Sequence, residues 1–140
     1  MLIEKPEHID KVAAGCIMYC DDKVLLFKRT DTGVWNSIVG NMKGEENPRV
    51  AIRREIMEEL NISVETEEIA VLYHKYGKEL VEYHLNFARI NKSQAKSIKL
   101  NYEHSDYGLF SIDEALKLEL FEDKDYCQKL VNNKLINNEL

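Results

Sequence analysis

Three glutamates, Glu55, Glu58 and Glu59, lie close together in the segment E-I-M-E-E. Positions three and four apart share one face of a helix, so a helix would hold these carboxylates within about one turn of each other. Like charges held together repel, and a divalent cation removes that repulsion. Clustered oxygen ligands suit Mg²⁺ or Mn²⁺, whereas zinc prefers the His and Cys that this segment lacks. The simpler alternative is a solvated acidic face, the usual role of a charge run.

The residues on either side of the glutamates predict the helix that would position them. Asn47 can cap its start, because the side-chain oxygen can accept a hydrogen bond from an N–H of the first turn. Pro48 then falls at the first helical position, where its missing N–H costs nothing. Asn61 tolerates left-handed backbone and can end the helix. The apolar stripe beside the glutamates consists of Ile52, Ile56 and Leu60.

A glycine-bearing loop, residues 40–44, comes immediately before this helix. Glycine lets the backbone approach a phosphate closely, and helix N-termini attract anions. Arg54 stands next to Glu55 in the sequence and could hold a carboxylate through a charge-assisted hydrogen bond. The loop, the arginine and the carboxylates together therefore favour a site for a metal ion and a phosphate group.

The stretch from residue 40 to residue 62 resembles the Nudix box, G-x5-E-x7-R-E-U-x-E-E-x-G-U, in which U is apolar. The matching positions are Gly40, Glu46, Arg54, Glu55, Ile56, Glu58, Glu59 and Ile62. Asn61 replaces the final glycine, which is a mild change because Asn also accepts left-handed backbone. Many relatives read Pro-Gly-Gly at the entry to the box, where this chain reads Val-Gly-Asn.

The resemblance implies hydrolysis of a nucleoside diphosphate linked to another group. It implies a divalent metal ion, Mg²⁺, for which Mn²⁺ could substitute. The implied metal ligands are Gly40, Glu55, Glu58, Glu59 and Glu103. It assigns catalytic roles to Glu55, Glu58, Glu103 and Arg54, and Glu46 is expected to orient these groups. The metal would neutralise the polyphosphate and activate water, and one carboxylate would accept the water's proton. Whether that carboxylate belongs to the box or is Glu103 stays open.

Glu103 and His104 belong to a second, shorter similarity. The fragment Glu103-His104-x-x-Tyr107, followed by L-F-S-I-D-E-A-L, is similar to E-H-x-x-Y segments of Nudix hydrolases of dinucleoside polyphosphates and deoxynucleoside triphosphates. His104 could orient Glu103 or contact the substrate; the alternative is a pair of residues in a solvated loop. The residues expected to contact substrate are Arg29, Trp35, Lys43 and His104. The alternative for Arg29 is a solvated strand end, and for Trp35 core packing is favoured.

The favoured function is Mg²⁺-dependent hydrolysis of a pyrophosphate bond in a (deoxy)nucleoside triphosphate or a dinucleoside polyphosphate such as diadenosine tetraphosphate. One alternative is an enzyme similar to isopentenyl diphosphate isomerase, which needs an added cysteine facing the metal. Cys16 and Cys20 lie on the first predicted strand and keep this alternative open. Another is a non-catalytic nucleotide-binding regulatory module, which would not require every glutamate.

Length and composition restrict the class of protein and its partners. The chain has 140 residues and a net charge of −6, which predicts a single domain over residues 1–140. It has no basic block, so a long nucleic acid is not an expected partner, whereas a small nucleotide could bind through the metal. No signal peptide or membrane span is expected, since the longest apolar run is residues 12–20. The three cysteines form no disulfide framework, which favours a location in the reducing cytoplasm. The protein is expected to be a monomer or a homodimer.

The resemblance and the residue patterns predict an α/β protein with the Nudix fold, a mixed β-sheet sandwiched between α-helices. The expected strands are residues 12–19, 23–29, 62–66, 69–76, 81–87 and 107–110. The polar residues 91–97 are expected to form a loop. Ser111 and Glu114 predict a capping box for a helix over residues 112–118. A last helix is expected over about residues 123–132, before a polar tail that should fray.

Overall fold

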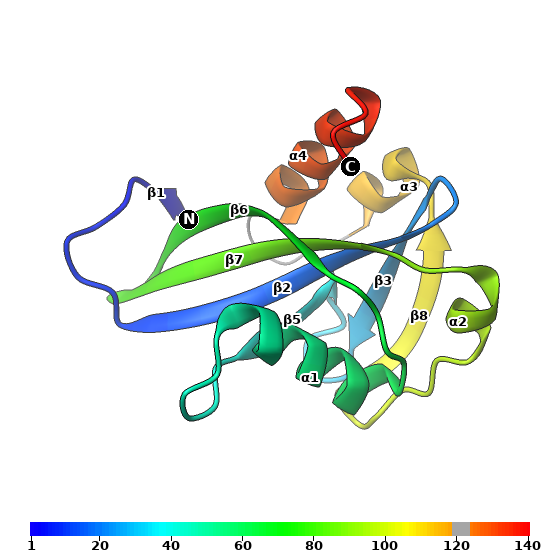
Figure 1. The fold of residues 1–140 in the computed structure, drawn as a ribbon, viewed down its shortest axis with the longest axis horizontal. Coiled ribbons are helices and arrows are strands. Elements are labelled where there is room, and N and C mark those ends of the chain that lie inside the picture. The colour runs from blue at the N-terminus through cyan, green and yellow to red at the C-terminus, as the bar shows by residue number, and fades with distance from the viewer. Residues whose placement is uncertain (119–123) are drawn as a thin grey trace.

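The structure is a computed structural model in which residues 1–118 and 124–140 are described. A curled, mixed β-sheet forms its centre, with helices on both sides (Figure 1). The strands are β1 (Leu2–Ile3), β2 (Lys11–Cys20), β3 (Lys23–Arg29), β4 (Trp35–Asn36), β5 (Ile38–Asn41), β6 (Glu67–Tyr76), β7 (Glu79–Arg89) and β8 (His104–Phe110). The helices are α1 (Pro48–Leu60), α2 (Lys92–Lys96), α3 (Ile112–Lys117) and α4 (Lys124–Ile136). The predicted α/β class and the mixed sheet between helices are confirmed.

The sheet is built on β2. This strand pairs in parallel with β7, and antiparallel with β3 and β5 along different parts of its length. The pairing with β5 places Gly40 opposite Ala14 and Asn41 opposite Ala13. Because β5 leads into the loop before α1, this pairing fixes where the loop begins.

The side chains of β2 alternate between two apolar cores. On one face, the core includes Ala14, Cys16, Met18, Ile52, Ile56 and Leu60. On the other face, the core includes Ile17, Tyr19, Leu85, Ala115 and Val131. In Figure 1, α1 covers the first face, and α3 and α4 cover the second. Both faces of the central strand are therefore buried, which explains its almost continuous apolar sequence.

Helix α1 begins and ends as predicted. Asn47 Oδ1 accepts a hydrogen bond from the Val50 N–H at 2.9 Å, and Pro48 is the first helical residue. Asn61 adopts left-handed backbone, with φ 58° and ψ 36°, and its N–H donates to the Met57 carbonyl oxygen. The fixed ends determine which side chains of the helix face the sheet.

Two sequence-based expectations about local structure are wrong. Residues 62–66 form no strand, although Ile62 and Val64 are buried and alternate with exposed neighbours. Both side chains pack into the α1-side core, so burial alone explains the alternation. Residues 91–97 contain helix α2 rather than a loop, because Asn91 and Gln94 form a reciprocal capping box. The N-x-x-Q spacing is consistent with a capping box, but the polar composition of the segment favoured a loop.

The remaining differences concern boundaries and short strands. Strand β8 begins at His104, not at residue 107, because its pairing with β3 continues past a bulge at Lys28 and Arg29. Helix α4 extends to Ile136, while residue 123, the expected start, lies outside the described residues. Strands β1 and β4 are two residues long, too short to show a period in the sequence. Within the described residues, no helix combines the length and apolarity needed to cross a membrane.

Asn61 provides a test of the helix end. Asn61→Ala should lower the free energy of unfolding by roughly 1–2 kcal/mol, because alanine keeps the Cβ that left-handed backbone crowds but lacks the polar side chain that can hydrogen-bond locally. Asn61→Gly should change it by less than about 1 kcal/mol, because glycine adopts this conformation freely. Urea denaturation followed by circular dichroism measures both values. Equal destabilisation by the two substitutions would show that the Asn61 side chain, and not the backbone conformation at this position, determines the contribution of residue 61 to stability.

Candidate active site

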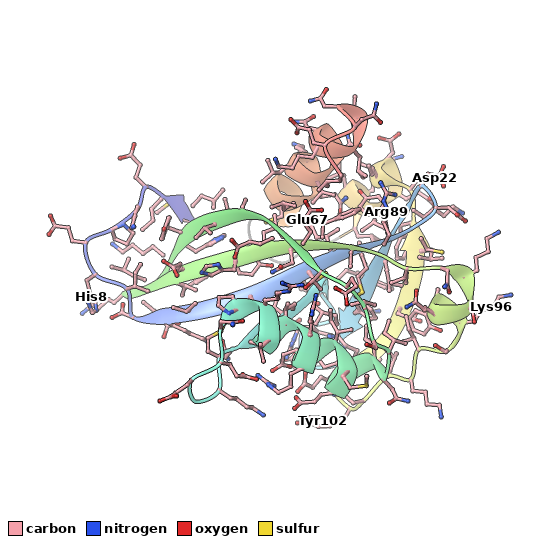
Figure 2. The ribbon with its side chains drawn as sticks, viewed as in Figure 1. His8, Asp22, Glu67, Arg89, Lys96 and Tyr102 are labelled. Atoms are coloured by element: carbon pink, nitrogen blue, oxygen red, sulfur yellow. The ribbon has the colours of Figure 1, made fainter. Side chains whose placement is uncertain are left out.

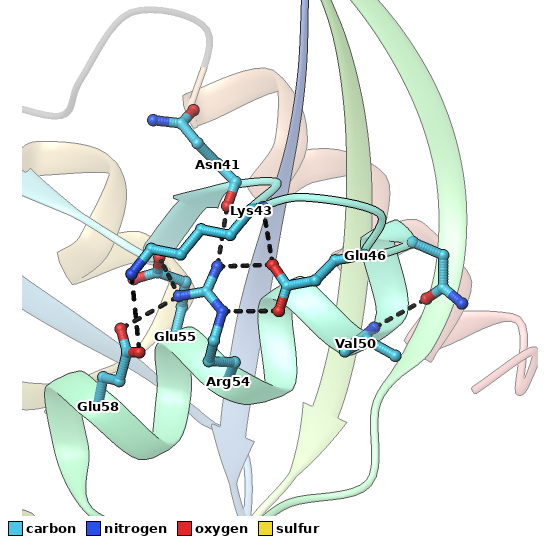
Figure 3. Close-up of polar contacts among 8 residues, drawn as sticks. Asn41, Lys43, Glu46, Val50, Arg54, Glu55 and Glu58 are labelled. Atoms are coloured by element: carbon cyan, nitrogen blue, oxygen red, sulfur yellow. Dashed lines mark hydrogen bonds and ion pairs between the residues drawn. The ribbon is translucent and has the colours of Figure 1, made fainter.

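The Arg54 guanidinium joins α1 to the loop that precedes it (Figure 3). Two of its nitrogens donate to the two carboxylate oxygens of Glu46 at 2.7 and 2.9 Å. The third donates to Glu55 at 2.9 Å and to Glu58 at 3.1 Å. Arg54 also donates to the backbone oxygen of Asn41 at 3.0 Å. The hydrogen bonds between Glu46 and Arg54 lower the pKa of the carboxyl and raise that of the guanidinium, so both groups stay charged.

The same Glu46 carboxylate closes the loop between β5 and α1. It accepts a hydrogen bond from the Lys43 N–H at 2.8 Å, and Gly44 supplies left-handed backbone with φ +56°. The Lys43 side chain is exposed, and its Nζ lies 4.0 Å from Glu58. Glu46 thus contacts the loop and Arg54, the position that an orienting role requires.

Gly40 lies so close to Glu55 that no side chain would fit between them. A Cβ atom at Gly40 would lie 2.0 Å from Glu55 Cγ and 2.5 Å from its Cδ. Gly40 is also paired with Ala14 in the sheet, so it cannot move away without disrupting the pairing of β2 and β5. The packing therefore requires glycine here, and it places a strand backbone directly beside a carboxylate.

Glu59, Glu103 and His104 form a cluster in which Glu59 and His104 are buried and Glu103 is half-buried, here called the buried group. Glu59 is 4% exposed and His104 is 5% exposed, and the three side chains offer ligand atoms within 4.8 Å of one another. Burial and a hydrogen bond with Glu103 raise the pKa of Glu59 well above its usual value of 4.5. Burial, with a contribution from the nearby Arg29, lowers the pKa of His104. Without a cation, Glu59 is therefore stabilised in its protonated form.

The group also fits a divalent cation. Glu59 Oε2 is buried and has no hydrogen-bond partner among the described residues. Buried polar atoms are almost always paired, and an unpaired one is costly, so such an atom calls for an explanation. Carboxylate oxygens are the ligands that Mg²⁺ and Mn²⁺ prefer, and a cation here would replace the proton on Glu59.

Arg29 brings a positive charge to this group from the end of β3. Its Nε and a terminal nitrogen donate to the two oxygens of Asp31 at 2.9 and 3.0 Å. This pair lowers the pKa of Asp31 and raises that of Arg29, and Glu103 and Glu59 are close enough to add to the effect on Arg29. The Asp31 carboxylate thus fixes the orientation of a guanidinium that can face a bound anion.

The buried group opens into a cleft of about 460 Å³, here called the acidic cleft. Its charged lining residues are Arg29, Lys43, Glu55, Glu59 and Glu103. Tyr102 lies at its rim and is almost fully exposed; Figure 2 shows it beyond α1. The cleft therefore combines a carboxylate floor with two cationic side chains, an arrangement suited to a metal ion and a phosphate chain.

A second cleft, also about 460 Å³, adjoins the first and is here called the aromatic cleft. The two clefts share Arg29, Val39, Gly40 and Asn41. The aromatic cleft is further lined by Asn36, His74, Tyr76 and Tyr83. The rings of His74 and Tyr76 stack at 5.6 Å with an interplanar angle of 6°. Asn36 Oδ1 is buried and has no hydrogen-bond partner among the described residues.

The structure brings together most of the residues predicted for the site. Those that line the acidic cleft are Arg29, Gly40, Lys43, Glu55, Glu59 and Glu103, with His104 beside Glu59 and Glu103. Glu58 lies on a more exposed part of α1, beside Arg54 and Lys43. Trp35 is not brought to the acidic cleft; its ring packs edge-to-face against Phe110 at 5.2 Å. This contact is core packing, the role favoured for Trp35.

The aromatic cleft was not predicted from the sequence. His74 and Tyr76 are two positions apart on β6, a spacing that places both on one face of a strand, so a signal for their stacking existed. Asn36 gave no such signal, because it lies on a strand of two residues and reaches the cleft wall through the tertiary fold. The Asp31 partner of Arg29 was also missed.

The chain matches the family model described as the NUDIX domain over residues 10–130. It is also 32% identical over 76 residues to a protein described as MutT-like from Streptomyces ambofaciens. That match covers 54% of this chain and 49% of the relative, and so spans about half of the relative's length.

Several solved structures share the fold. The Ap4A hydrolase binary complex of C. elegans has a TM-score of 0.75 at 18% identity, covering 91% of this chain and 98% of that chain. The MutT NUDIX hydrolase of Burkholderia pseudomallei has a TM-score of 0.74 at 24% identity, covering 86% of this chain and 97% of that chain. The NUDIX domain of Shewanella oneidensis NrtR, complexed with ADP ribose, has a TM-score of 0.78 at 13% identity, covering 91% of this chain and 90% of that chain. At these identities the likeness establishes the fold.

The raised pKa of Glu59 predicts how the stability of the metal-free protein depends on pH. Unfolding releases the buried proton above pH 4.5, the usual pKa of a glutamate, so stability should fall as pH rises from there toward the folded pKa. Glu59→Gln cannot ionise and should flatten this dependence. Melting temperatures in EDTA at about pH 5, 7 and 9 test this, with the exposed Glu67→Gln as the control. Parallel pH profiles for the parent and Glu59→Gln would contradict the assignment.

Proposed function

The chain belongs to the NUDIX hydrolase family, and from this premise we propose that it hydrolyses a pyrophosphate bond in a nucleoside diphosphate derivative. The observation that carries the proposal is the pair formed by the buried Glu59 and the half-buried Glu103 in a cleft that also presents Arg29. Nucleotide binding alone would not require two acidic side chains to be held side by side. A site that holds a cation and activates water would.

A divalent metal ion, Mg²⁺ or Mn²⁺, is the proposed cofactor. The groups that would hold it are Glu55, Glu58, Glu59, Glu103 and the backbone of Gly40. When bound, the ion would neutralise negative charge on the polyphosphate and lower the pKa of a water molecule. Arg54 is hydrogen-bonded to Glu55 and Glu58, so these two carboxylates would divide their oxygens between the ion and the guanidinium.

Each remaining group has a proposed task that follows from its contacts. Glu103 lines the acidic cleft and is less buried than Glu59, so it can accept the proton of the attacking water and pass it to solvent. Arg54 orients Glu55, and Glu46 in turn holds Arg54. Lys43 and Arg29 can donate hydrogen bonds to phosphate oxygens, Arg29 from the orientation that Asp31 imposes.

The proposed substrate is a (deoxy)nucleoside triphosphate or a dinucleoside polyphosphate such as diadenosine tetraphosphate. The aromatic cleft supports this choice, because the stacked His74 and Tyr76 flank a space where a planar base can pack. Asn36 also lines this cleft and places a polar side chain beside such a base. Since the clefts share Gly40 and Asn41, a base in one would place its phosphates in the other.

The structure gives no support to the isomerase alternative. Cys16 and Cys20 are buried in the α1-side core, and burial raises the pKa of the Cys16 thiol. An acid–base cysteine must reach the substrate, which neither side chain does from this position.

A panel of substrates tests the proposed function. Product chromatography should show hydrolysis of at least one of dGTP, ATP, diadenosine tetraphosphate and ADP ribose, and EDTA should abolish it. The last two belong in the panel because structures of similar fold are an Ap4A hydrolase and a complex with ADP ribose. Tight nucleotide binding without metal-dependent turnover would instead favour the regulatory module.

Glu103→Gln tests the assignment of the general base. The substitution should lower kcat by about ten- to a thousand-fold while KM changes little, the pattern expected when a transition-state interaction is lost. Glu59→Gln should lower kcat further, because it removes a buried metal ligand. Glu67→Gln is the matched control on an exposed position, labelled in Figure 2. An unchanged kcat in folded Glu103→Gln would move the search for the base to Glu55.

A further inference from the structure

We propose that His104 supplies a ring nitrogen to the metal ion held by Glu59 and Glu103, and that this mixed nitrogen and oxygen site binds Mn²⁺ or Co²⁺ more tightly than Mg²⁺. The inference rests on the proposed function, because it concerns the metal of the same site. It differs from the roles expected from the sequence, in which His104 orients Glu103 or contacts the substrate.

The fold holds the His104 ring in place behind the acidic cleft. His104 is the first residue of β8 and is paired with Arg29 of β3, so its backbone is fixed. Its imidazole lies 5.5 Å from the ring of Phe27, centroid to centroid, and the residue is almost completely buried. A side chain held in this way needs little further ordering to act as a ligand.

Two orphaned polar atoms lie in this small group. Both His104 Nδ1 and Glu59 Oε2 are buried, and neither has a hydrogen-bond partner among the described residues. Neither can reach water, and each offers a lone pair when the imidazole nitrogen carries no proton. A cation bound by this group would be the partner of both atoms.

The spacing of the ligand atoms agrees with a single ion. Ligand atoms of Mg²⁺ or Mn²⁺ lie about 2.1 Å from the metal, so two neighbouring ligands of an octahedral ion are about 3.0 Å apart and two opposite ligands about 4.2 Å apart. The ligand atoms offered by Glu59, Glu103 and His104 all lie within 4.8 Å of one another. Closing the group around an ion therefore requires these atoms to approach by at most about 1.8 Å, a movement that rotation of the side chains can supply.

The two roles expected from the sequence explain His104 less well. Among the described residues that line the acidic cleft, His104 does not appear, so a substrate in the cleft would meet Glu103 and Arg29 first. An orienting role would require a hydrogen bond between His104 and Glu103, and none is formed within the described residues.

His84 provides an internal comparison. It also lies between two glutamates, but both of its ring nitrogens are already hydrogen-bonded, to Glu68 and Glu82. The ring nitrogens of His84 are therefore occupied, whereas Nδ1 of His104 is available.

The ligand set determines which ions the site should favour. Mg²⁺ binds oxygen and accepts imidazole poorly, whereas Mn²⁺ and especially Co²⁺ bind imidazole nitrogen as well as carboxylate oxygen. A nitrogen ligand among the glutamates therefore shifts the preference of the site away from Mg²⁺.

Pulsed electron paramagnetic resonance of the Mn²⁺-loaded full chain, without substrate, tests the inference directly. The unlabelled protein should show coupling of Mn²⁺ to a ¹⁴N nucleus, and protein carrying ¹⁵N-histidine should show ¹⁵N coupling in its place. This comparison needs no substitution and so does not depend on how a variant folds. Bound Mn²⁺ without histidine coupling would overturn the role of His104 and leave the metal-dependent hydrolase proposal standing. Failure to bind Mn²⁺ would overturn the inference, while hydrolysis with Mg²⁺ would still decide the proposed function.

Substitution then assigns the nitrogen to one residue. His104→Phe keeps a ring against Phe27 and removes both nitrogens, so the coupling should disappear. By calorimetry, affinity for Mn²⁺ should fall about ten-fold or more, and affinity for Mg²⁺ by less than about three-fold. His84→Gln should change neither quantity. Loss of the coupling in His84→Gln, or its persistence in folded His104→Phe, would overturn the assignment.

Discussion

The Arg54 guanidinium is the interaction on which the candidate site depends. It binds Glu46, Glu55 and Glu58 and also holds the backbone of Asn41, so one cation satisfies most of the acidic side chains of the box. Glu59 lies on the buried side of the same helix, outside this network. One short helix thus carries carboxylates that are hydrogen-bonded to an arginine and one buried acidic side chain, Glu59, that is not. That difference, created by a single arginine, marks the position on the helix where an acidic group could accept a cation.

The sheet brings the second half of the site to this helix. Glu103 comes just before β8, and β8 pairs with β3, at whose end Arg29 lies. The β5 strand pairs with β2 and delivers Gly40 to the side of Glu55. Segments far apart in the sequence therefore meet around one cleft because each is anchored by strand pairing, and strand pairing resists the repulsion between the carboxylates that it brings together.

Local sequence signals predicted the helix and its charges well, because caps and helical spacing act over a few residues. Asn47, Pro48 and Asn61 are found in the roles predicted for them. Helical spacing alone could not predict that Glu59 is buried and Glu58 more exposed, since both fall near the same helical face. Their different burial depends on where the sheet lies, which is a property of the whole fold.

The same limit explains the other differences. Residues 62–66 have the alternation of a strand, but a strand also needs a partner, and a pattern in one segment does not supply it. The aromatic cleft combines β6 with Asn36 and with the wall of the acidic cleft, and no single segment contains its chemistry. By contrast, the short Glu103-His104 similarity did identify residues of the buried group, because both are adjacent in the chain.

The contact between Gly40 and Glu55 has a consequence for how this protein can change over generations. The space that a Cβ would occupy at Gly40 is filled by the Glu55 side chain, and the sheet prevents the strand from retreating. A larger residue at position 40 requires the Glu55 side chain to move aside or to become smaller, and either change displaces or removes a carboxylate of the cleft. The two positions are therefore coupled, and a lineage that changes position 40 also alters its candidate site.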